Sequence, residues 1–332
     1  MTTRIFSGIQ PTGTLHIGNY FGALRNWATL QHEVPCIYCV VDYHAITIDV
    51  DPQALRAASR SMALDMISAG IDPETSIVFV QSDVPHHTEL AWILGCVTSY
   101  GDLGRMTQFK DKSTKQQFIS AGLLTYPILQ AADILIYRAD GVPVGEDQEQ
   151  HLELSRRIAR RFNGRFGEYF PEPEPIIRKG ARIMSLADPE RKMSKSEGDK
   201  HYVGVFEDEA AIRKKVRSAV TDTGLEAGDE ASPGITNLFE ILELSCEQLG
   251  DSSIVNELKA EFAAGTLMYS KLKDTVFERM MDILRPIREK RQALEASGEI
   301  VDILAAGAKK AETIAAETMG EVRKLVGLGS QI

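Results

Sequence analysis

Apolar residues follow two different patterns in the first two hundred positions. Short, nearly continuous apolar runs predict strands at 4–7, 36–42, 77–81 and 181–186, and residues 141–150 predict a further strand, a glycine turn and a helix start. The stretches between the first three runs have helical periodicity, and one helix should begin at the Asp51-Pro52 cap. Continuous apolar runs suit strands that are buried on both faces of a parallel sheet. The pattern therefore predicts an α/β fold with a doubly wound parallel sheet.

Beyond residue 205 only the helical pattern is left. Helices are expected at 209–219, 237–249, 253–263, 268–296 and 301–325. Pro286 should kink or end the fourth helix, because proline lacks a backbone N–H. We therefore expect a doubly wound domain at 1–204, an α-helical domain at 205–297 and a C-terminal helix at 298–332 that packs back on the first domain.

Residues 5–24 combine a strand, a glycine- and proline-containing loop and a helix start. Gly13 and Gly18 leave room for a ligand to approach closely, and His16 and Asn19 stand at the mouth of the helix. Unpaired N–H groups at a helix start favour anions. This segment therefore predicts a phosphate-binding loop.

Polar residues also occur beside two apolar segments. Asp42, Tyr43 and His44 follow the second expected strand at its carboxyl end, where open α/β sheets bind ligands. Asp133 stands inside the apolar segment 123–138. Burial of an unpaired carboxylate is costly, so a protein donor or a ligand donor should reach it. A helix cap or an internal hydrogen bond is an alternative of equal weight to a ligand site.

Basic residues gather in two further places. Lys192 and Lys195 lie in RKMSKSEG, a polar segment without apolar periodicity that predicts a mobile loop able to neutralise phosphate charge. An ordinary surface loop is the alternative. A row of arginines on the helix after residue 150 would suit phosphates if it lacks acidic partners; its members are Arg156, Arg157, Arg160, Arg161 and Arg165.

Composition narrows the class of protein. The 332 residues and 43% apolar content suffice for a large domain and a smaller second one, and the net charge of −10 argues against indiscriminate nucleic-acid binding. No apolar run approaches the length of a membrane span and the first residues lack the blocks of a signal peptide, so a cytoplasmic protein without membrane contact is expected. Cys36 and Cys39 should face opposite sides of a strand, which favours core packing over a zinc site.

Several motifs resemble those of a known enzyme family. HIGN at 16–19 and KMSKS at 192–196 resemble the two signatures of class I aminoacyl-tRNA synthetases. The resemblance extends to the bacterial tryptophanyl-tRNA synthetases through SGIQPTG, VDYHAIT, RMTQFKDKS, LLTYPILQAADIL, PVGEDQ and ARIMSL. It covers essentially the whole catalytic half and continues less distinctively to the carboxyl end. Two positions depart from the pattern: Asn19 replaces the last histidine of the signature and cannot carry charge, and Gln130 stands where relatives often have methionine.

The resemblance implies an ATP site between the two signatures. The residues it places around ATP are Gln10, His16, Gly18, Asn19, Gly145, Asp147, Ile183, Lys192, Met193, Ser194 and Lys195. Adenine would meet the backbone near Ile183 and Met193, and Gly145 and Asp147 would hold the ribose. The residues implied in catalysis are Lys192, Lys195, Lys112 and Gln10, with Lys112 reaching the outer phosphates.

For tryptophan, the resemblance implies a second set of contacts. Asp133 would accept the indole N–H, and Tyr126 and Gln148 would bind the ammonium group. The ring pocket would be lined by Phe6, His44, Gln130 and Val144. An indole N–H only donates, so a buried carboxylate separates tryptophan from phenylalanine by one polar group.

The implied reaction is that of a tryptophan–tRNA ligase. ATP and L-tryptophan would give tryptophanyl-AMP and pyrophosphate, with Mg²⁺ held mainly by the ATP phosphates and no side-chain metal ligand, and tryptophan would then pass to the 3′ end of tRNA(Trp). The family also implies a homodimer formed through a region at about 101–170, which includes acceptor contacts, and anticodon contacts at 205–297.

Three other functions fit parts of the pattern. A tyrosyl-tRNA synthetase shares the signatures but should carry a tyrosine beside the aspartate, where this chain has Ala132. An adenylyltransferase of another pathway would not need so large a helical domain. A non-catalytic RNA-binding paralogue is disfavoured because Lys192, Lys195, Gln10 and Asp133 are all present.

Overall fold

A parallel sheet of five strands organises the first half of the chain in the computed structural model, which describes residues 4–113, 118–143, 145, 148–176, 182–221 and 231–329. The strand order is β3-β2-β1-β4-β5, and all four pairings are parallel. The strands are β1 (Ile5–Ile9), β2 (Cys36–Val40), β3 (Ile77–Val80), β4 (Gly141–Pro143) and β5 (Glu174–Ile176). This order, which reverses between β1 and β4, confirms the doubly wound fold.

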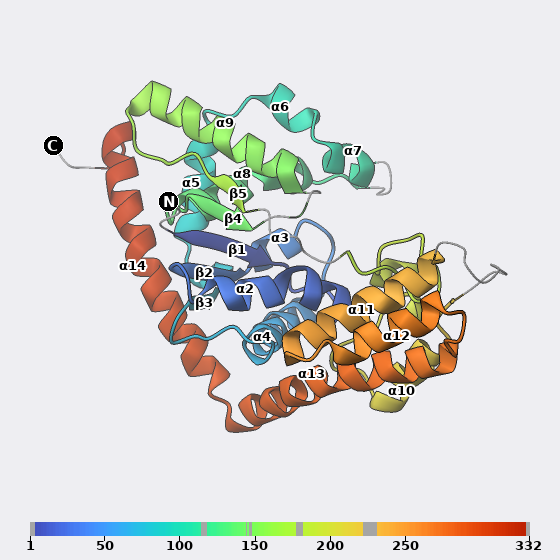
Figure 1. The fold of residues 1–332 in the computed structure, drawn as a ribbon. Coiled ribbons are helices and arrows are strands. Elements are labelled where there is room, and N and C mark those ends of the chain that lie inside the picture. The colour runs from blue at the N-terminus through green and yellow to red at the C-terminus, as the bar shows by residue number, and fades with distance from the viewer. Residues whose placement is uncertain are drawn as a thin grey trace.

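Helices cover both faces of the sheet (Figure 1). Cys36, Tyr38 and Val40 belong to one apolar core, whereas Ile37 and Cys39 belong to the other. The helices that flank the strands are α2 (Arg25–Leu30), α3 (Asp42–Ala45), α4 (Pro52–Ser68), α5 (His86–Gly95), α6 (Tyr100–Gly104), α7 (Thr107–Ser113), α8 (Ala121–Leu135) and α9 (Glu149–Phe166). Both cysteines are buried and free, as core packing predicted.

The helix expected after the first loop is continuous but irregular. It begins as α1 (Ile17–Asn19), continues as a π-helical segment at Tyr20–Leu24 and ends as α2. π-helical turns are rare and occur frequently at functional sites. Short 3₁₀ turns occur at Gln81–Asp83, Lys195–Glu197 and Asp199–His201.

One strand prediction was wrong. Residues 182–186 form no strand of the sheet, but Met184 makes an isolated antiparallel bridge to Lys192. The fifth strand is instead β5, whose three residues include a proline and are too few to give a periodic pattern. The apolar residues at 183–186 pack against the lysine segment, which accounts for their strand-like composition.

The second half of the described chain is helical, as predicted. Its helices are α10 (Glu209–Arg217), α11 (Pro233–Leu249), α12 (Ser253–Ala263), α13 (Tyr269–Ser297) and α14 (Ile300–Val326). Pro286 does not end α13, because that helix continues for eleven residues beyond it. Helices α10 to α13 pack beside the sheet domain, whereas α14 runs back along it (Figure 1).

Polar contacts join the helical part to the sheet domain. Arg291 of α13 lies 2.6 Å from Asp65 of α4 and 2.9 Å from the Ser61 hydroxyl. Burial raises the pKa of Asp65 to about 6 even though Arg291 opposes the shift. The Arg291 guanidinium also lies 4.9 Å from the centre of the Phe206 ring. One arginine therefore joins α13, α4 and the segment that follows the lysine motif.

Helix α14 packs against β3 and α5 and adds Ala311, Ala315, Met319 and Val322 to the second core. At Gly307 the helix touches the strand so closely that a Cβ atom would stand 1.8 Å from the carbonyl oxygen of Val78. Only glycine allows this distance. Gly320, in the same helix, has no atom within 4 Å of the corresponding position.

Gly307→Ala should therefore lower the free energy of unfolding by about 3 kcal/mol, because the methyl group forces α14 away from β3. Gly320→Ala is the matched control and should be neutral or stabilising by up to about 1 kcal/mol, since alanine is the better helix former. Urea unfolding followed by circular dichroism measures both changes. Equal midpoints for the two variants would contradict the close packing of α14 on β3.

Candidate functional site

The strand order reverses between β1 and β4, and loops leave the carboxyl ends of both strands at this point. In open α/β sheets this is where ligands bind. The loop after β1 contains Gln10 to Leu15, and the turn after β4 contains Gly145 and Gln148. The topology therefore brings two of the segments that were singled out in the sequence to one crevice.

The first signature segment is held by backbone pairing to a distant part of the chain. Ile17 N–H donates to Val203 O at 3.0 Å, and Val205 N–H donates to Leu15 O at 2.9 Å. Asn19 Oδ1 accepts a 3.4 Å hydrogen bond from His16 N–H, so this side chain closes the first helical turn. Asn19 thus supports the loop through its side-chain oxygen.

The lysine segment folds directly onto that loop. Met193 N–H donates to Ile183 O at 3.0 Å, and Met193 and Ile183 are both buried. A Cβ atom at Gly13 would stand 2.5 Å from Lys195 Nζ, and one at Gly18 would stand 3.5 Å from Met193 Cβ. Gly13 also has a φ of +71°, which favours glycine. The structure therefore brings the two signatures into contact across these glycines.

His16 and Lys195 have shifted pKa values at this contact. Burial, followed by the charges of Lys195 and Lys192, lowers the pKa of His16 to about 4. Burial also lowers the pKa of Lys195, against the attraction of Asp65. His16 is 7% exposed, and its Nδ1 has no hydrogen-bond partner among the described residues. A neutral, buried imidazole with an unsatisfied nitrogen is suited to a polar ligand.

Asp133 is the centre of a second polar cluster. Its Oδ1 lies 2.6 Å from Gln81 Nε2 and 2.7 Å from His87 Nδ1, and its Oδ2 lies 2.7 Å from His44 Nε2. Burial by itself would raise the pKa of Asp133, but the hydrogen bonds and charges of His44 and His87 outweigh it and lower the pKa to about 2. The internal hydrogen bonds that were one alternative for Asp133 are therefore present.

The face of α8 that carries Asp133 also carries Tyr126 and Gln130, at helical spacings of seven and three residues. Tyr126 donates from its hydroxyl to Gln108 Oε1 at 3.1 Å and lies 2.7 Å from His151 Nε2, and burial raises its pKa to about 12. Gln130 is half-buried. The His44 ring lies edge-on to the Tyr126 ring, with centroids 6.2 Å apart.

Phe6 joins this cluster from β1. Its ring stacks on Tyr137 with centroids 5.6 Å apart, and the Tyr137 hydroxyl lies 2.7 Å from His87 Nε2. The structure therefore connects Phe6, through Tyr137 and His87, to the cluster of Asp133, His44 and Tyr126.

The other residues expected at the ATP and tryptophan sites are mostly exposed or lie outside the described part of the chain. Gln10, Gly145 and Lys192 are exposed, and Ser194 is half-buried. Gln148 caps α9 and donates its N–H to Gly145 O at 2.9 Å. Lys112 belongs to α7, and its side chain lies outside the described part of the chain; Val144 and Asp147 lie outside it entirely.

Sequence reasoning missed Gln81, His87 and Tyr137. Gln81 follows β3 at the same sheet edge where Asp42, Tyr43 and His44 follow β2, so strand-end position was the available signal for it. Tyr137 stands four residues after Asp133, in the turn that follows α8. His87 carried no signal, because its contact with Asp133 depends on the packing of α5 against α8.

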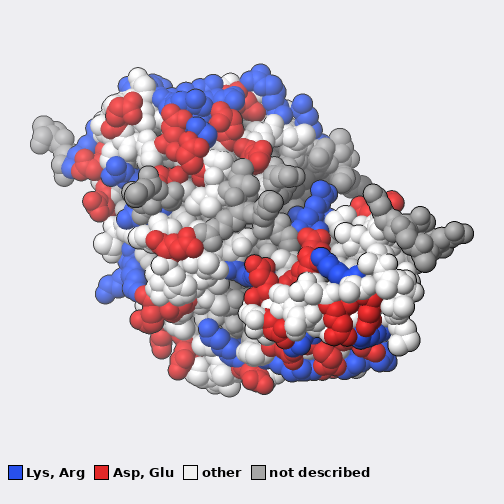
Figure 2. Space-filling model, in the orientation of Figure 1, with Lys and Arg blue, Asp and Glu red and all other residues white. Residues whose placement is uncertain are grey.

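Two sequence hypotheses change with the structure. Asp42 accepts hydrogen bonds from the backbone N–H and the hydroxyl of Ser82, so it joins the ends of β2 and β3. Four of the five arginines of α9 do have acidic partners, contrary to the premise under which they would suit phosphates. Arg157 and Arg161 bind the buried Asp102, and Arg156 and Arg160 bind Glu153, Glu172 and Glu174. Red and blue side chains are accordingly mixed over α9 (Figure 2).

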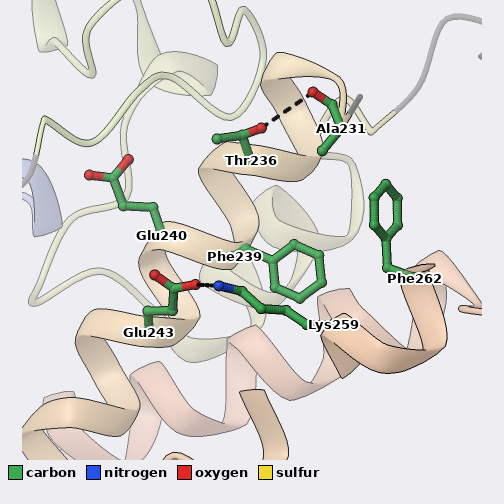
Figure 3. Close-up of a pocket in the computed structure, with 7 residues that line it drawn as sticks. All are labelled: Ala231, Thr236, Phe239, Glu240, Glu243, Lys259 and Phe262. Carbon is green, nitrogen blue, oxygen red and sulfur yellow. Dashed lines mark hydrogen bonds and ion pairs between the residues drawn. The ribbon is translucent and has the colours of Figure 1, made fainter. Parts of the chain in front are cut away.

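A separate hollow lies between α11 and α12 in the helical part (Figure 3). Phe239 and Phe262 form its apolar side, with ring centroids 6.1 Å apart. Lys259 is the one lysine among the described residues that line it, and it is paired with Glu243, while Glu240 adds a further carboxylate. The lining therefore does not favour phosphate, and the hollow shares no residue with the signature contact.

Comparison with known proteins agrees with this geometry. A family model described as class I tRNA synthetases for tryptophan and tyrosine matches residues 1–285. The chain belongs to this family. It is 46% identical to the tryptophan–tRNA ligase of Halalkalibacterium halodurans over 99% of each chain. This identity assigns it to the bacterial tryptophanyl-tRNA synthetases and confirms the resemblance seen in its motifs.

Solved synthetase structures share the whole architecture. The tryptophanyl-tRNA synthetase of Mycoplasma pneumoniae superimposes with a TM-score of 0.89 at 34% identity, over 100% of this chain and 99% of that one. The Campylobacter jejuni synthetase, solved with ADP and tryptophan, gives a TM-score of 0.85 at 36% identity, over 98% of this chain and 100% of that one. Among the described residues of the present chain, no helix is long and apolar enough to cross a membrane.

The environment of His16 makes a direct prediction. Its ring should stay neutral between pH 8 and pH 5 and take up a proton near pH 4, because burial and two lysines oppose the charge. In the unfolded chain the pKa of this histidine is near 6.5, so proton uptake favours the unfolded state. The contribution of neutral His16 to the free energy of unfolding is therefore fully present above pH 6.5 and is lost as the pH falls through about 4.

NMR titration of the His16 ring carbons measures this pKa. In Lys195→Met the pKa should rise but stay below 6.5, since burial is the larger cause and persists. A wild-type midpoint near 6.5 would contradict the contact between the two signatures.

Proposed function

We propose that this protein joins L-tryptophan to tRNA(Trp) in two steps. In the first, a tryptophan carboxylate oxygen attacks the α-phosphorus of ATP, the bond to the bridging oxygen of the β-phosphate breaks, and tryptophanyl-AMP and pyrophosphate form. In the second, a terminal ribose hydroxyl of the tRNA, the 2′-OH in class I enzymes, attacks the tryptophanyl carbonyl and AMP leaves. The observation that carries the proposal is the contact of Lys195 and Met193 with Gly13 and Gly18.

ATP lies between the two signatures in this proposal. His16 Nδ1 lacks a partner in the described chain, and Gly13 and Gly18 leave no side chain between the loop and a phosphate. Gln10 and Asn19 face the phosphates from the first loop, and Ser194 from the lysine segment. Adenine meets the backbone at Ile183 and Met193, and Gly145 and Asp147 hold the ribose.

Lys195 must move when ATP binds. Its Nζ now occupies the space over Gly13, where the loop would otherwise admit phosphate. A lysine that leaves this position can follow the charge as it develops on the departing pyrophosphate, together with Lys192 and Lys112. The lysine segment therefore acts late in the reaction, and a conformational step accompanies catalysis.

Mg²⁺ binding rests on the nucleotide rather than on a protein cage. The described residues hold no cluster of three or more histidine, cysteine or carboxylate side chains that could bind a metal ion. The side chains at the signature contact are lysines, an imidazole and amides, which suit phosphate better than a hard cation. Mg²⁺ would supply charge neutralisation on the pyrophosphate.

Tryptophan binds beside α8. Asp133 Oδ2 has one donor, His44, among the described residues, and can accept an indole N–H as well. Asp133 is 1% exposed, so tryptophan must displace side chains that now cover its carboxylate. Tyr126 and Gln148 bind the ammonium group, and Phe6, His44, Gln130 and Val144 line the ring pocket.

The remaining parts of the chain serve the tRNA and the assembly. The helical region 205–297 contacts the anticodon, and 101–170 provides the acceptor contacts and the interface of a homodimer. The C-terminal region 298–332 completes the catalytic domain, which spans 1–204. The enzyme acts in the cytoplasm, where its tRNA substrate is found.

Amino-acid-dependent exchange of pyrophosphate into ATP tests the activity directly. Exchange should occur with tryptophan and be at least about 1000-fold weaker with tyrosine and phenylalanine, because a site built around a buried acceptor rejects ligands without the matching donor. Asp133→Asn should lower kcat/KM for tryptophan about 100-fold or more while the KM for ATP stays within about twofold. Exchange with tyrosine alone, or with no amino acid, rules out the proposed activity.

The late action of the lysine segment is tested by Lys195→Ala. Its kcat should fall by a factor of about 100 or more while the equilibrium Kd for ATP changes less than about threefold, since the contact forms only as charge develops. Lys200→Ala is the matched control, because Lys200 is an exposed lysine five residues further on. Single-turnover kinetics and equilibrium ATP titration give the two constants, and equal losses in both would indicate ordinary ATP binding instead.

A further inference from the structure

The two oxygens of Asp133 have different surroundings. Oδ1 has two donors, Gln81 Nε2 at 2.6 Å and His87 Nδ1 at 2.7 Å. Oδ2 has one, His44 Nε2 at 2.7 Å, among the described residues. Each carboxylate oxygen offers two acceptor positions. Oδ1 is therefore satisfied, and the open acceptor position belongs to Oδ2.

These contacts determine where the ring hydrogens lie. An ionised carboxylate only accepts, so His87 carries a hydrogen on Nδ1 and His44 carries one on Nε2. The Tyr137 hydroxyl lies 2.7 Å from His87 Nε2, and burial raises the pKa of Tyr137, so the phenol keeps its proton and donates a hydrogen bond to Nε2 when the His87 ring is neutral. A chain of donors thus runs from Tyr137 through His87 to Asp133 Oδ1.

Packing holds this chain of donors in one arrangement. His87 and Tyr137 are both 0% exposed, and the His87 ring packs against the rings of Phe79 and Tyr137, with centroid distances of 5.9 and 5.4 Å. Gln81 is fixed in turn, because its Oε1 accepts the N–H of Tyr43 at 3.0 Å. The carboxylate plane of Asp133 therefore cannot rotate without breaking several buried hydrogen bonds.

The geometry points to His87 as a positioning residue for tryptophan recognition: held by Tyr137, it fixes the Asp133 carboxylate so that the open position on Oδ2 is directed to the indole N–H. This inference rests on the proposed function and deepens it. His87 does not touch the ligand in this scheme. It acts by satisfying Oδ1, so that the remaining acceptor capacity of the ionised carboxylate is confined to one oxygen.

The test compares tryptophan with β-(benzothiophen-3-yl)alanine, in which sulfur replaces the indole N–H, in the pyrophosphate exchange assay. The measured quantity is the ratio of kcat/KM for the two substrates. In the wild type this ratio should be large, because only tryptophan donates to Oδ2. His87→Leu should lower the ratio about tenfold or more, with the KM for ATP unchanged within about twofold. His87→Asn keeps a donor near the position of Nδ1 and should recover part of the loss.

Two further variants separate positioning from simple structural support. Tyr137→Phe removes only the hydroxyl and should lower the ratio by a smaller factor, so the inference can be tested even if His87→Leu folds poorly. His86→Leu is the matched control, because His86 precedes His87 in α5 but pairs with Glu89 and Glu312. Its ratio should equal that of the wild type.

The possible outcomes separate a failure of the proposed tryptophan contact at Asp133 from a failure of the proposed role of His87. A wild-type ratio near one would mean that Asp133 does not recognise the indole N–H, and the proposed tryptophan contact would fail. A large wild-type ratio that is unchanged in His87→Leu, His87→Asn and Tyr137→Phe would retain that contact and overturn the role of His87.

Discussion

Two backbone hydrogen bonds, between residues 15–17 and 203–205, hold together segments that are almost two hundred residues apart. They fix the helix start after β1 against the chain that leaves the lysine motif. Met193 and Lys195 can therefore meet Gly18 and Gly13 only because both ends of the lysine segment are anchored, at Ile183 on one side and at Val203 on the other. The nucleotide site depends on this pairing, since neither signature alone provides two walls.

The stability of the buried Asp133 carboxylate has a different physical basis. An ionised Asp133 inside an apolar helix face is stable only because three protein donors surround it. Those donors come from the ends of β2 and β3 and from α5, so the sheet edge and one flanking helix must be in place before the charge can be buried. The same arrangement leaves one acceptor position unused. A folding requirement and a specificity determinant thus share one side chain.

Much of this architecture could be predicted from the sequence, because periodicity is a local signal. The apolar runs identified β1, β2 and β3, and the helical pattern identified α11 to α14 within a few residues. Prediction failed where structure depends on distant partners. β5 is only three residues long, and Ile183 and Leu186 are buried in one core with Met193 of the lysine segment without belonging to a strand of the sheet. For the site, motifs indicated Asp133 and Lys195, whereas His87 became visible only through the packing of α5 on α8. The arginines of α9 show the converse error, since most of their acidic partners lie outside this helix, at Asp102, Glu172 and Glu174, and only Glu153 belongs to α9.

The close contact between Gly307 and Val78 has a consequence for the order of events during synthesis. β3 is the last strand at one end of the sheet, and an uncovered edge strand can pair with other chains. The helix that packs against it is α14, which leaves the ribosome more than two hundred residues later. The nascent sheet domain is therefore exposed at this edge until the final helix emerges. Until α14 is in place, the edge of β3 favours pairing with other chains over a smaller stable domain.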